Sequence, residues 1–507
     1  MPASSEPLLN YDILLEVAYL ADRRTCASLM LTCKALNKAA AKSILRPLSG
    51  RITLWTDRDV ALLLRFLHAD PSRFQYVREI DISLELMSPY TNDDVERLLD
   101  GLRRMERLDT LGILHAEITL ESSVFFDGVA RLTKIRQLEL QGAEDFACGL
   151  LSQMQADLVS IHVDWLPRDS DDDFYDYRYH PVPLLAKWTA TLEELTWEWY
   201  TYPTALPEFT QVYPKLRRLS FLSDSFPHIA PFIRAYPNLV RFTVRTQCNI
   251  DDGIDPDSLT QQLRDRRAVN IQSQRDQGGG KTVTWTHLEE LVGSVIDLYA
   301  LGLTCRIQRV HIDDSVSSHW DLEFPVYEFL PAVLEYAQPR HLKVQGDSML
   351  LIHPSHGLTT LLRSGSCAEH LESLVLDFNF PDEDSDIVTA LSDLADSLRR
   401  LPLRRLRLRL RITILDRSDS TPSRYHEMPE PQEAVAFIST IENLDLEAYV
   451  RDLVDALPSL EDAVVCAKGE QEDEDANECL VTRTAEVVRV RRLGPEYADR
   501  EMYEWSD

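Results

Sequence analysis

The chain lacks long apolar runs, a basic leader segment and paired cysteines. No apolar stretch approaches the roughly 20 residues that cross a bilayer. Acidic residues interrupt the apolar run in MPASSEPLLNYDILLEVAYL, so we expect neither a membrane span nor a secretory signal. The eight cysteines include no C-x-x-C pair. This favours reduced thiols in the cytoplasm or nucleus over a disulfide or zinc framework.

Basic charge is also scarce. Lysine and arginine together number 53 against 83 acidic residues, which gives a formal net charge of −30. Phosphates are bound by concentrated cations, so we expect no nucleic-acid partner for the surface as a whole, and no membrane partner. The 507 residues, 44% of them hydrophobic, still suffice for several domains or one long repeat array.

Recognisable catalytic, cofactor and metal motifs are missing too. GGGKT at 278–282 resembles the end of a P-loop, but Arg275 stands where the first glycine is needed. His353 and His356 have a spacing that metal sites use, yet they flank Pro354 in an apparent loop. We therefore expect a protein that is not an enzyme and holds no cofactor or metal. One alternative stays open, an enzyme that binds nucleotide through residues 247–287.

The N-terminal segment has helical periodicity. Leu9, Ile13, Val17 and Leu20 recur at helical spacing, and two further short apolar runs follow before position 48. Three short helices cannot bury much surface by themselves. Residues 7–48 are therefore expected to lean on a partner or on the following domain.

A different pattern returns throughout the rest of the chain. It reads apolar-x-x-apolar-x-apolar, and its fourth and sixth positions alternate with polar residues as in a strand. Copies begin at Val77, Ile135, Leu158, Leu192, Leu216, Leu239, Leu288, Ile307, Pro339, Leu371, Leu403 and Leu460.

The spacing of these copies predicts an α/β solenoid with a parallel sheet. Successive copies from 307 to 403 are 32 residues apart, and helix-like stretches at 93–105, 226–236, 326–337 and 386–401 lie between strands. We expect a connecting helical segment at 49–75, the solenoid at 76–493 and a tail at 494–507. Polar stretches at 169–179, 247–287 and 416–431 are interpreted as loops. The stretch 468–479 is interpreted as an acidic turn between short closing strands.

Residues 7–48 resemble the F-box, the adaptor-binding motif of SCF ubiquitin ligases. The family positions are taken by Leu9, Asp12, Ile13, Leu14, Val17, Leu20, Leu29, Cys33 and Lys34. Asn10 stands where the family usually has proline, and it still suits a helix start. The resemblance implies a small three-helix F-box that binds the Skp adaptor, and through it the cullin ligase core. The implied contact residues are Leu9, Ile13, Leu14, Val17, Leu20, Leu29 and Cys33.

The repeats resemble the irregular leucine-rich repeats of F-box proteins, especially the large fungal set. This resemblance implies the substrate-recognition subunit of an SCF-type E3 ligase, in which the solenoid holds an unknown protein substrate. A leucine-rich-repeat-like scaffold that never joins a ligase remains the alternative.

The most basic stretch is LRRLRLRLRI at 403–412, in which leucines and arginines alternate. On a strand the two kinds of side chain point to opposite faces. In a parallel solenoid the non-leucine face is the concave one, which we expect to bind carboxylates or phosphates of the substrate. The alternative for the arginines is a pattern that only keeps this edge soluble. The candidate residues are Arg241, Arg245, Arg309, His311, His341, Lys343, Arg405, Arg407 and Arg409.

Overall fold

The computed structural model is of mixed α/β type and forms two compact units. The first comprises Met1–Leu222 with Ala235–Pro237, and the second Ser223–Arg234 with Asn238–Asp507. Residues 76–493, expected as one repeat region, are thus shared between two units. The structure describes residues 10–46, 51–84, 91–166, 179–200, 209–247, 256–276, 284–314, 325–364, 369–380, 387–412, 445–468, 477–483 and 488–492.

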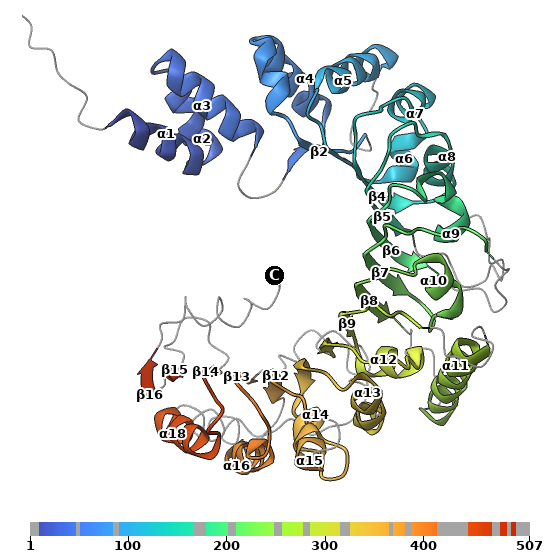
Figure 1. Cartoon of the computed structure of the whole chain (residues 1–507). Helices are drawn as coiled ribbons and strands as arrows, with labels where there is room; N and C mark the ends of the chain where they lie inside the picture. The colour runs from blue at the N-terminus through green and yellow to red at the C-terminus, as the bar shows by residue number, and fades with distance from the viewer. Residues whose placement is uncertain are drawn as a thin grey trace, which may run out of the picture. The chain divides into compact units, whose positions relative to one another are not determined.

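The first unit contains strands that follow one another in chain order (Figure 1). Pairing from the first of them to the sixth is parallel throughout. The strands are β1 (Ile52–Leu54), β2 (Glu79–Ile82), β3 (Thr110–Ile113), β4 (Gln137–Ala143), β5 (Ser160–Trp165), β6 (Glu194–Tyr200) and β7 (Arg218–Ser223).

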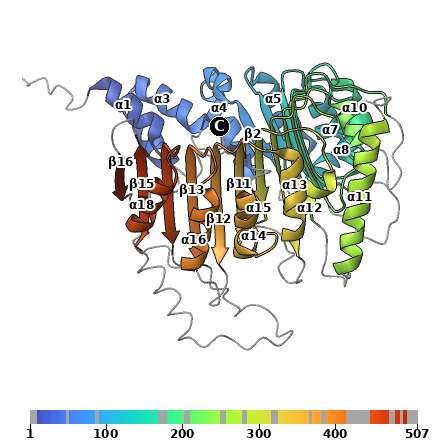
Figure 2. The same ribbon diagram turned by 60° about the horizontal axis from the view of Figure 1, so that its bottom comes forward.

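The strands of the second unit are also in chain order and lie side by side in Figure 2. They are parallel up to β14. β15 then pairs antiparallel with β14, and β16 pairs antiparallel with β15. The strands are β8 (Arg241–Thr246), β9 (Glu290–Gly293), β10 (Arg309–Asp313), β11 (His341–Asp347), β12 (Ser373–Phe380), β13 (Arg405–Ile412), β14 (Asp462–Lys468), β15 (Asn477–Arg483) and β16 (Val488–Arg492).

Short helices connect the strands, and α4 (Asp57–His68), α5 (Asn92–Arg104) and α12 (Val295–Leu301) begin with a capping box. In it the N-cap hydroxyl accepts from the backbone amide of the third helical residue, and the carboxylate of that residue accepts from the N-cap backbone amide. The first unit holds α1 (Tyr11–Leu20), α2 (Arg23–Met30), α3 (Lys34–Leu45), α4 (Asp57–His68), η1 (Pro71–Tyr76), α5 (Asn92–Arg104), α6 (Ala116–Leu120), α7 (Ser123–Ala130), α8 (Asp145–Gln153), α9 (Pro181–Leu184) and η3 (Ala186–Trp188).

The helices of the second unit lie on one side of its strands (Figure 1). They are α10 (Ala230–Ala235), α11 (Pro256–Asp276), α12 (Val295–Leu301), η6 (Val326–Phe329), α13 (Leu330–Ala337), α14 (Ser348–Ile352), α15 (Leu358–Ser364), α16 (Ile387–Leu398) and α18 (Leu446–Ala456).

All twelve strands expected from the repeated pattern are present, and the predicted parallel sheet is confirmed. The fourth and sixth pattern residues point to the helices, where Leu374 and Leu376 of β12 are fully buried. The residues between them point to the opposite side of the strands, which we call the open face. The core of each unit therefore lies between its strands and its helices.

Two strands were not predicted. The segment 49–75, expected to be helical, contains α4 and η1 but also β1. Strand β3 carries the pattern as Leu108, Leu111 and Ile113, all buried. This strand was missed because Gly112 lies between its last two apolar positions, and glycine is rare in strands.

The interpretation of 247–287 as one loop is wrong, because most of its central part is the helix α11. The side of α11 that packs against the rest of the second unit begins with the buried Leu259 and Leu263. It continues with Asn270 and Gln274, which are also fully buried. Helical periodicity did not reveal this helix, because two of the four buried positions named here carry the polar residues Asn270 and Gln274 instead of apolar ones.

Other expectations concern segments that the structure does not describe. The predicted loop 416–431 and the tail 494–507 lie outside the described residues, as do nearly all of 169–179 and most of the acidic turn 468–479. The closing strands expected on either side of that turn are present as β14, β15 and β16. Within the described part of the chain, no helix has both the length and the apolar character needed to cross a bilayer.

Candidate functional site

The first candidate surface is built on α1, α2 and α3. Side chains start the first two of these helices: Asn10 accepts from the amide of Asp12 at 3.3 Å, and Asp22 accepts from the amide of Thr25 at 2.7 Å. Their common core is formed by three small residues that are fully buried, Ala18, Cys26 and Ala40. So small a core leaves the larger apolar side chains of α1 outside it.

An apolar face of α1 is therefore exposed. Ile13, Val17 and Leu20 are 50%, 42% and 63% exposed, and Leu31 beyond α2 is 90% exposed. Ile13 and Val17 lie one turn apart and form one stripe. Contiguous apolar surface of this kind marks an interaction site more often than a scattered exposed leucine does.

The other adaptor-contact residues predicted from the sequence lie in the same segment. Leu14 and Leu29 are half-buried, and Cys33 is exposed at the start of α3. Leu9 lies outside the described residues. Sequence reasoning missed Leu31, whose exposure follows from its position between two helices.

Polar contacts hold this segment against the following helices. The guanidinium of Arg73 donates to Oδ1 of Asn37 at 3.1 Å and to the carbonyl of Phe66 at 2.8 Å. Asn37 in turn donates to the carbonyl of Met30 at 2.9 Å. Because Arg73 is buried, these bonds are shielded from water. The exposed face of α1 is thus presented on a fixed support.

The second candidate surface is the open face. In the first unit it is dominated by carboxylates around one cation, Arg51. Its guanidinium contacts Glu79 at 3.2 Å, Asp81 at 3.4 Å and, through Nη2, Glu139 at 2.6 Å. These carboxylates come from β2 and β4. Arg51 can reach β4 because Gly112, on the strand between them, has no side chain in the way.

Most of the arginines expected to bind substrate are paired within the second unit. Arg241 contacts Glu290 at 3.3 Å, and Arg245 contacts Asp313 at 3.0 Å. Arg309 lies 3.8 Å from Glu289. These guanidiniums are about half exposed, so each pair contributes little stability and can exchange its partner.

Burial lowers the pKa values of the remaining basic candidates on β10 and β11. It lowers the pKa of His311 to about 4, helped by the nearby Lys343. His311 is therefore neutral at physiological pH, and its Nε2 lies 2.8 Å from the side-chain oxygen of Gln345. Burial also lowers the pKa values of His341 and Lys343. The histidines thus serve as hydrogen-bonding groups rather than as cations.

The arginine stripe of β13 is graded from exposed to buried. Arg405 is exposed, and Arg407 donates to Asp462 at 2.6 Å. Arg409 is only 5% exposed and lies 4.0 Å from Asp377. Asp377 also accepts two bonds from Arg411, at 2.8 and 2.7 Å. Of Arg405, Arg407 and Arg409, only Arg405 is exposed, so it is the one candidate on this strand that a partner can reach directly.

Two buried carboxyl groups of the second unit lie beside the start of α12: Asp314 directly after β10, and Asp297 in the first turn of the helix. Asp314 follows β10 and accepts from the amide of Val295 at 3.3 Å, while Asp297 accepts from the hydroxyl of Ser294 at 2.7 Å. Burial raises the pKa of Asp314 to about 8 and that of Asp297 to about 6. Each serves the start of α12, so their role is structural.

No known family model matches the chain, and no curated protein sequence matches it significantly. The function must therefore be argued from the surfaces themselves.

The other motifs examined in the sequence do not form a chemical site in the described part of the chain. His353 stacks on Tyr327 at 3.9 Å between ring centroids and on His356 at 5.7 Å. In the described ranges, no group of three or more histidines, cysteines and carboxylates is placed to hold a metal ion. The GGGKT stretch at 278–282 lies outside those ranges.

Proposed function

We propose that this chain is the substrate-recognition subunit of an SCF-type E3 ubiquitin ligase. Residues 7–48 act as the F-box and bind the Skp adaptor, which links the chain to the cullin core. The observation that carries the proposal is the exposed apolar stripe of Ile13, Val17 and Leu20 on a helix with a minimal core. Full burial of such a side chain contributes about 1.5–3 kcal/mol, so covering the exposed half of each contributes roughly half of that.

The remainder is proposed to be a leucine-rich-repeat-like solenoid that holds a protein substrate. Its support is the parallel pairing of strands in chain order, with a helix between most neighbours. In this proposal the substrate lies on the open face of the second unit. Exposed Arg405 and the exchangeable pairs of Arg241, Arg245 and Arg309 would meet its acidic groups.

The chain would perform no chemistry of its own. A ligase subunit of this kind contributes by holding its substrate close to a ubiquitin-charged enzyme, which is catalysis by proximity. The cytoplasm or nucleus is the proposed location. The described cysteines Cys26, Cys33, Cys148, Cys305 and Cys466 are all free thiols, which is compatible with a reducing compartment.

The proposed adaptor-binding surface is tested with the double variant Ile13→Asp and Val17→Asp. Both residues are exposed in the free chain, so we expect the variant to fold with an unchanged melting temperature. Coelution with the Skp adaptor in gel filtration should be lost, with affinity reduced about a hundredfold or more, because the carboxylates would be buried without partners.

The matched control is Leu62→Asp on α4, which changes an equally exposed leucine outside the segment. It should coelute with the adaptor like the unaltered chain. Coelution of the double variant would refute the adaptor surface. Failure of the unaltered chain to bind the adaptor would favour the alternative, a scaffold protein outside any ligase.

A further inference from the structure

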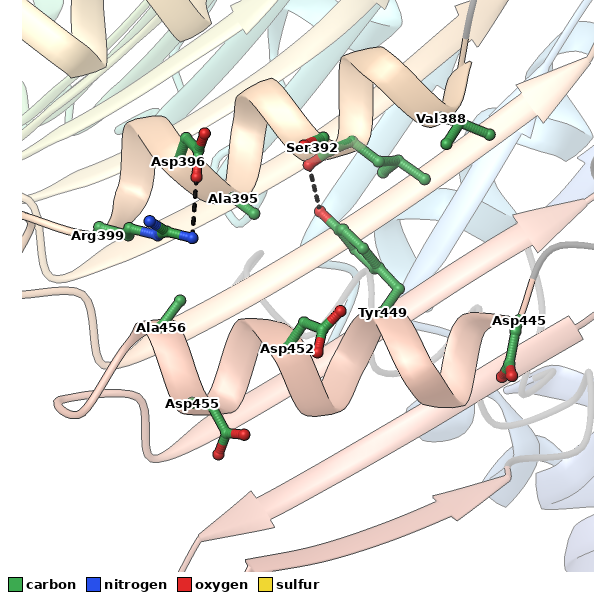
Figure 3. A pocket seen from close by; sticks show the side chains of 11 residues that line it. Val388, Ser392, Ala395, Asp396, Arg399, Asp445, Tyr449, Asp452, Asp455 and Ala456 are labelled. Carbon is green, nitrogen blue, oxygen red and sulfur yellow. Dashed lines mark hydrogen bonds and ion pairs between the residues drawn. The ribbon is translucent and has the colours of Figure 1, made fainter.

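A groove runs between α16 and α18 in the second unit (Figure 3). Its volume is about 700 Å³, within the range of roughly 300–1,000 Å³ that ligand pockets occupy. Val388, Ser392 and Ala395 line it from α16, and Tyr449 and Ala456 from α18. It lies on the helix side of the unit and is therefore separate from the open face.

The groove exists because the long side chain of Tyr449 holds α16 and α18 apart, while short side chains line the space between these helices. The hydroxyl of Tyr449 donates to the carbonyl of Leu391 at 3.2 Å and ties α18 to α16. Beside this contact, Ser392, Ala395 and Ala456 are too short to fill the space between the helix backbones. The groove is thus a built feature of these two helices.

Its walls are unequal in charge. On α16, Asp396 is neutralised by Arg399 at 3.1 Å. On α18, Asp445, Asp452 and Asp455 line the groove, and all three are exposed. They are spread over ten residues of sequence, or roughly 15 Å of helix, so they do not converge on one point. An occupant must match an extended row of negative charge.

The apolar part of the groove adds a second requirement. Val388 is 55% exposed at one end. The ring of Tyr449 and the methyl groups of Ala395 and Ala456 add further apolar surface. A simple counter-ion would leave this surface wet, whereas an amphipathic chain would cover it while its cations face α18.

We propose that the α16–α18 groove binds a basic amphipathic segment of a partner protein. Lysine or arginine side chains pair with Asp445, Asp452 and Asp455, and the apolar side of the segment covers Val388 and Tyr449. This surface is independent of adaptor binding by α1, so either proposal can fail without the other. It gives the chain a second docking site, selective for basic sequence.

The probe is a short fluorescein-labelled peptide of lysine and leucine with helical spacing, mixed with the full chain at about 0.15 M salt, where long-range attraction is screened. We expect fluorescence anisotropy to show saturable binding. Asp452→Lys with Asp455→Lys should weaken it about tenfold or more. Ser392→Trp, which fills the groove without changing charge, should weaken it similarly. The same peptide with glutamate for lysine should not bind.

The matched control is Glu96→Lys with Asp127→Lys, which reverses two exposed acids on α5 and α7 of the first unit. Its affinity should equal that of the unaltered chain. Equal weakening by this control would show general acidity to be responsible and overturn the proposal. The proposal is also overturned if the peptide does not bind, or if Ser392→Trp binds it with full affinity. It is overturned as well if spermine, added at the same concentration of positive charge, displaces the peptide.

Discussion

Gly112 illustrates how one residue permits a contact between distant strands. A Cβ atom at this position would lie 2.1 Å from Oδ1 of Asp81 and 3.0 Å from its Cγ. Asp81 would have to turn away from Arg51, and the cluster that joins Arg51 to Glu139 would be disturbed.

We expect Gly112→Ala to destabilise the first unit by roughly 1–3 kcal/mol, the usual cost of an overpacked site. Urea unfolding would measure it. The control is Gly149→Ala on α8, where the nearest atoms lie at the ordinary contact distances of 3.4 and 3.5 Å. Alanine favours a helix, so this variant should be neutral or slightly stabilising. Equal stability of the two variants would contradict the steric argument.

Asp314 makes stability depend on pH in an unusual direction. Burial raises its folded-state pKa to about 8, above the ordinary 3.8. Between these values the folded chain holds a proton that the unfolded chain has lost. The free energy of unfolding therefore falls as pH rises, by up to about 1.4 kcal/mol per pH unit for this group.

Asp314→Asn removes this titration. We expect the variant to gain stability relative to the unaltered chain as pH rises from about 5 to about 8, because the amide stays neutral. Chemical unfolding of both proteins across that range measures the difference. Asp127→Asn, at an exposed position, should show no such trend. A constant difference across pH would show that Asp314 is ionised throughout.

At the scale of elements, α11 is held by amide side chains. Nδ2 of Asn270 donates to the carbonyls of Pro227 and Ala300 at 3.1 and 2.9 Å, and its Oδ1 accepts from the amide of Ile229 at 3.2 Å. Gln274 donates to the carbonyl of Gly302 at 2.8 Å. The helix thus completes the hydrogen bonding of neighbouring backbone.

We expect Asn270→Leu to destabilise the second unit by roughly 2–4 kcal/mol. A leucine has a similar size but leaves two carbonyls and one amide buried without partners. Thermal unfolding of the full chain measures the loss. Gln261→Leu, on the exposed side of the same helix, serves as the control and should change little. Equal melting temperatures for the two variants would show that α11 does not depend on this amide.

The elements also show what the sequence could predict. Strands such as β12 and β13 were predictable because alternation depends on local spacing alone. Helix α11 was not, since its buried side is half polar. The ion pairs of the open face escaped prediction for another reason. Arg407 and Asp462 are 55 residues apart in sequence, and Arg245 and Asp313 are 68 apart. Only the strand register brings them together. For α1, helical spacing predicted the helix, but spacing alone does not tell which of its apolar residues are exposed. Ile13 and Val17 are exposed, whereas Leu14 between them is half-buried.

At the scale of the whole molecule, the net charge is −30, but the charged residues of the open face differ between the two units. The open face of the first unit carries Glu79, Asp81 and Glu139 around one arginine. That of the second unit carries all nine basic candidates. The sequence alone could not show that ion pairs within each face already neutralise much of this difference. Partner choice on these faces therefore depends on exchanging ion pairs more than on net charge.

The two outermost strands, β1 and β16, have a consequence for how copies of this chain meet. A stack of parallel strands could in principle continue from one molecule into the next, end to end, and so polymerise. Here the series ends in two antiparallel pairings: β15 runs against β14, and β16 runs against β15, back in the direction of the parallel strands. The sequence of the last strand, VRVRR, contains three arginines, so the strand at that edge carries like charges. At the other edge β1 has only three residues. Both features discourage fibre growth, so a chain built by repetition stays finite.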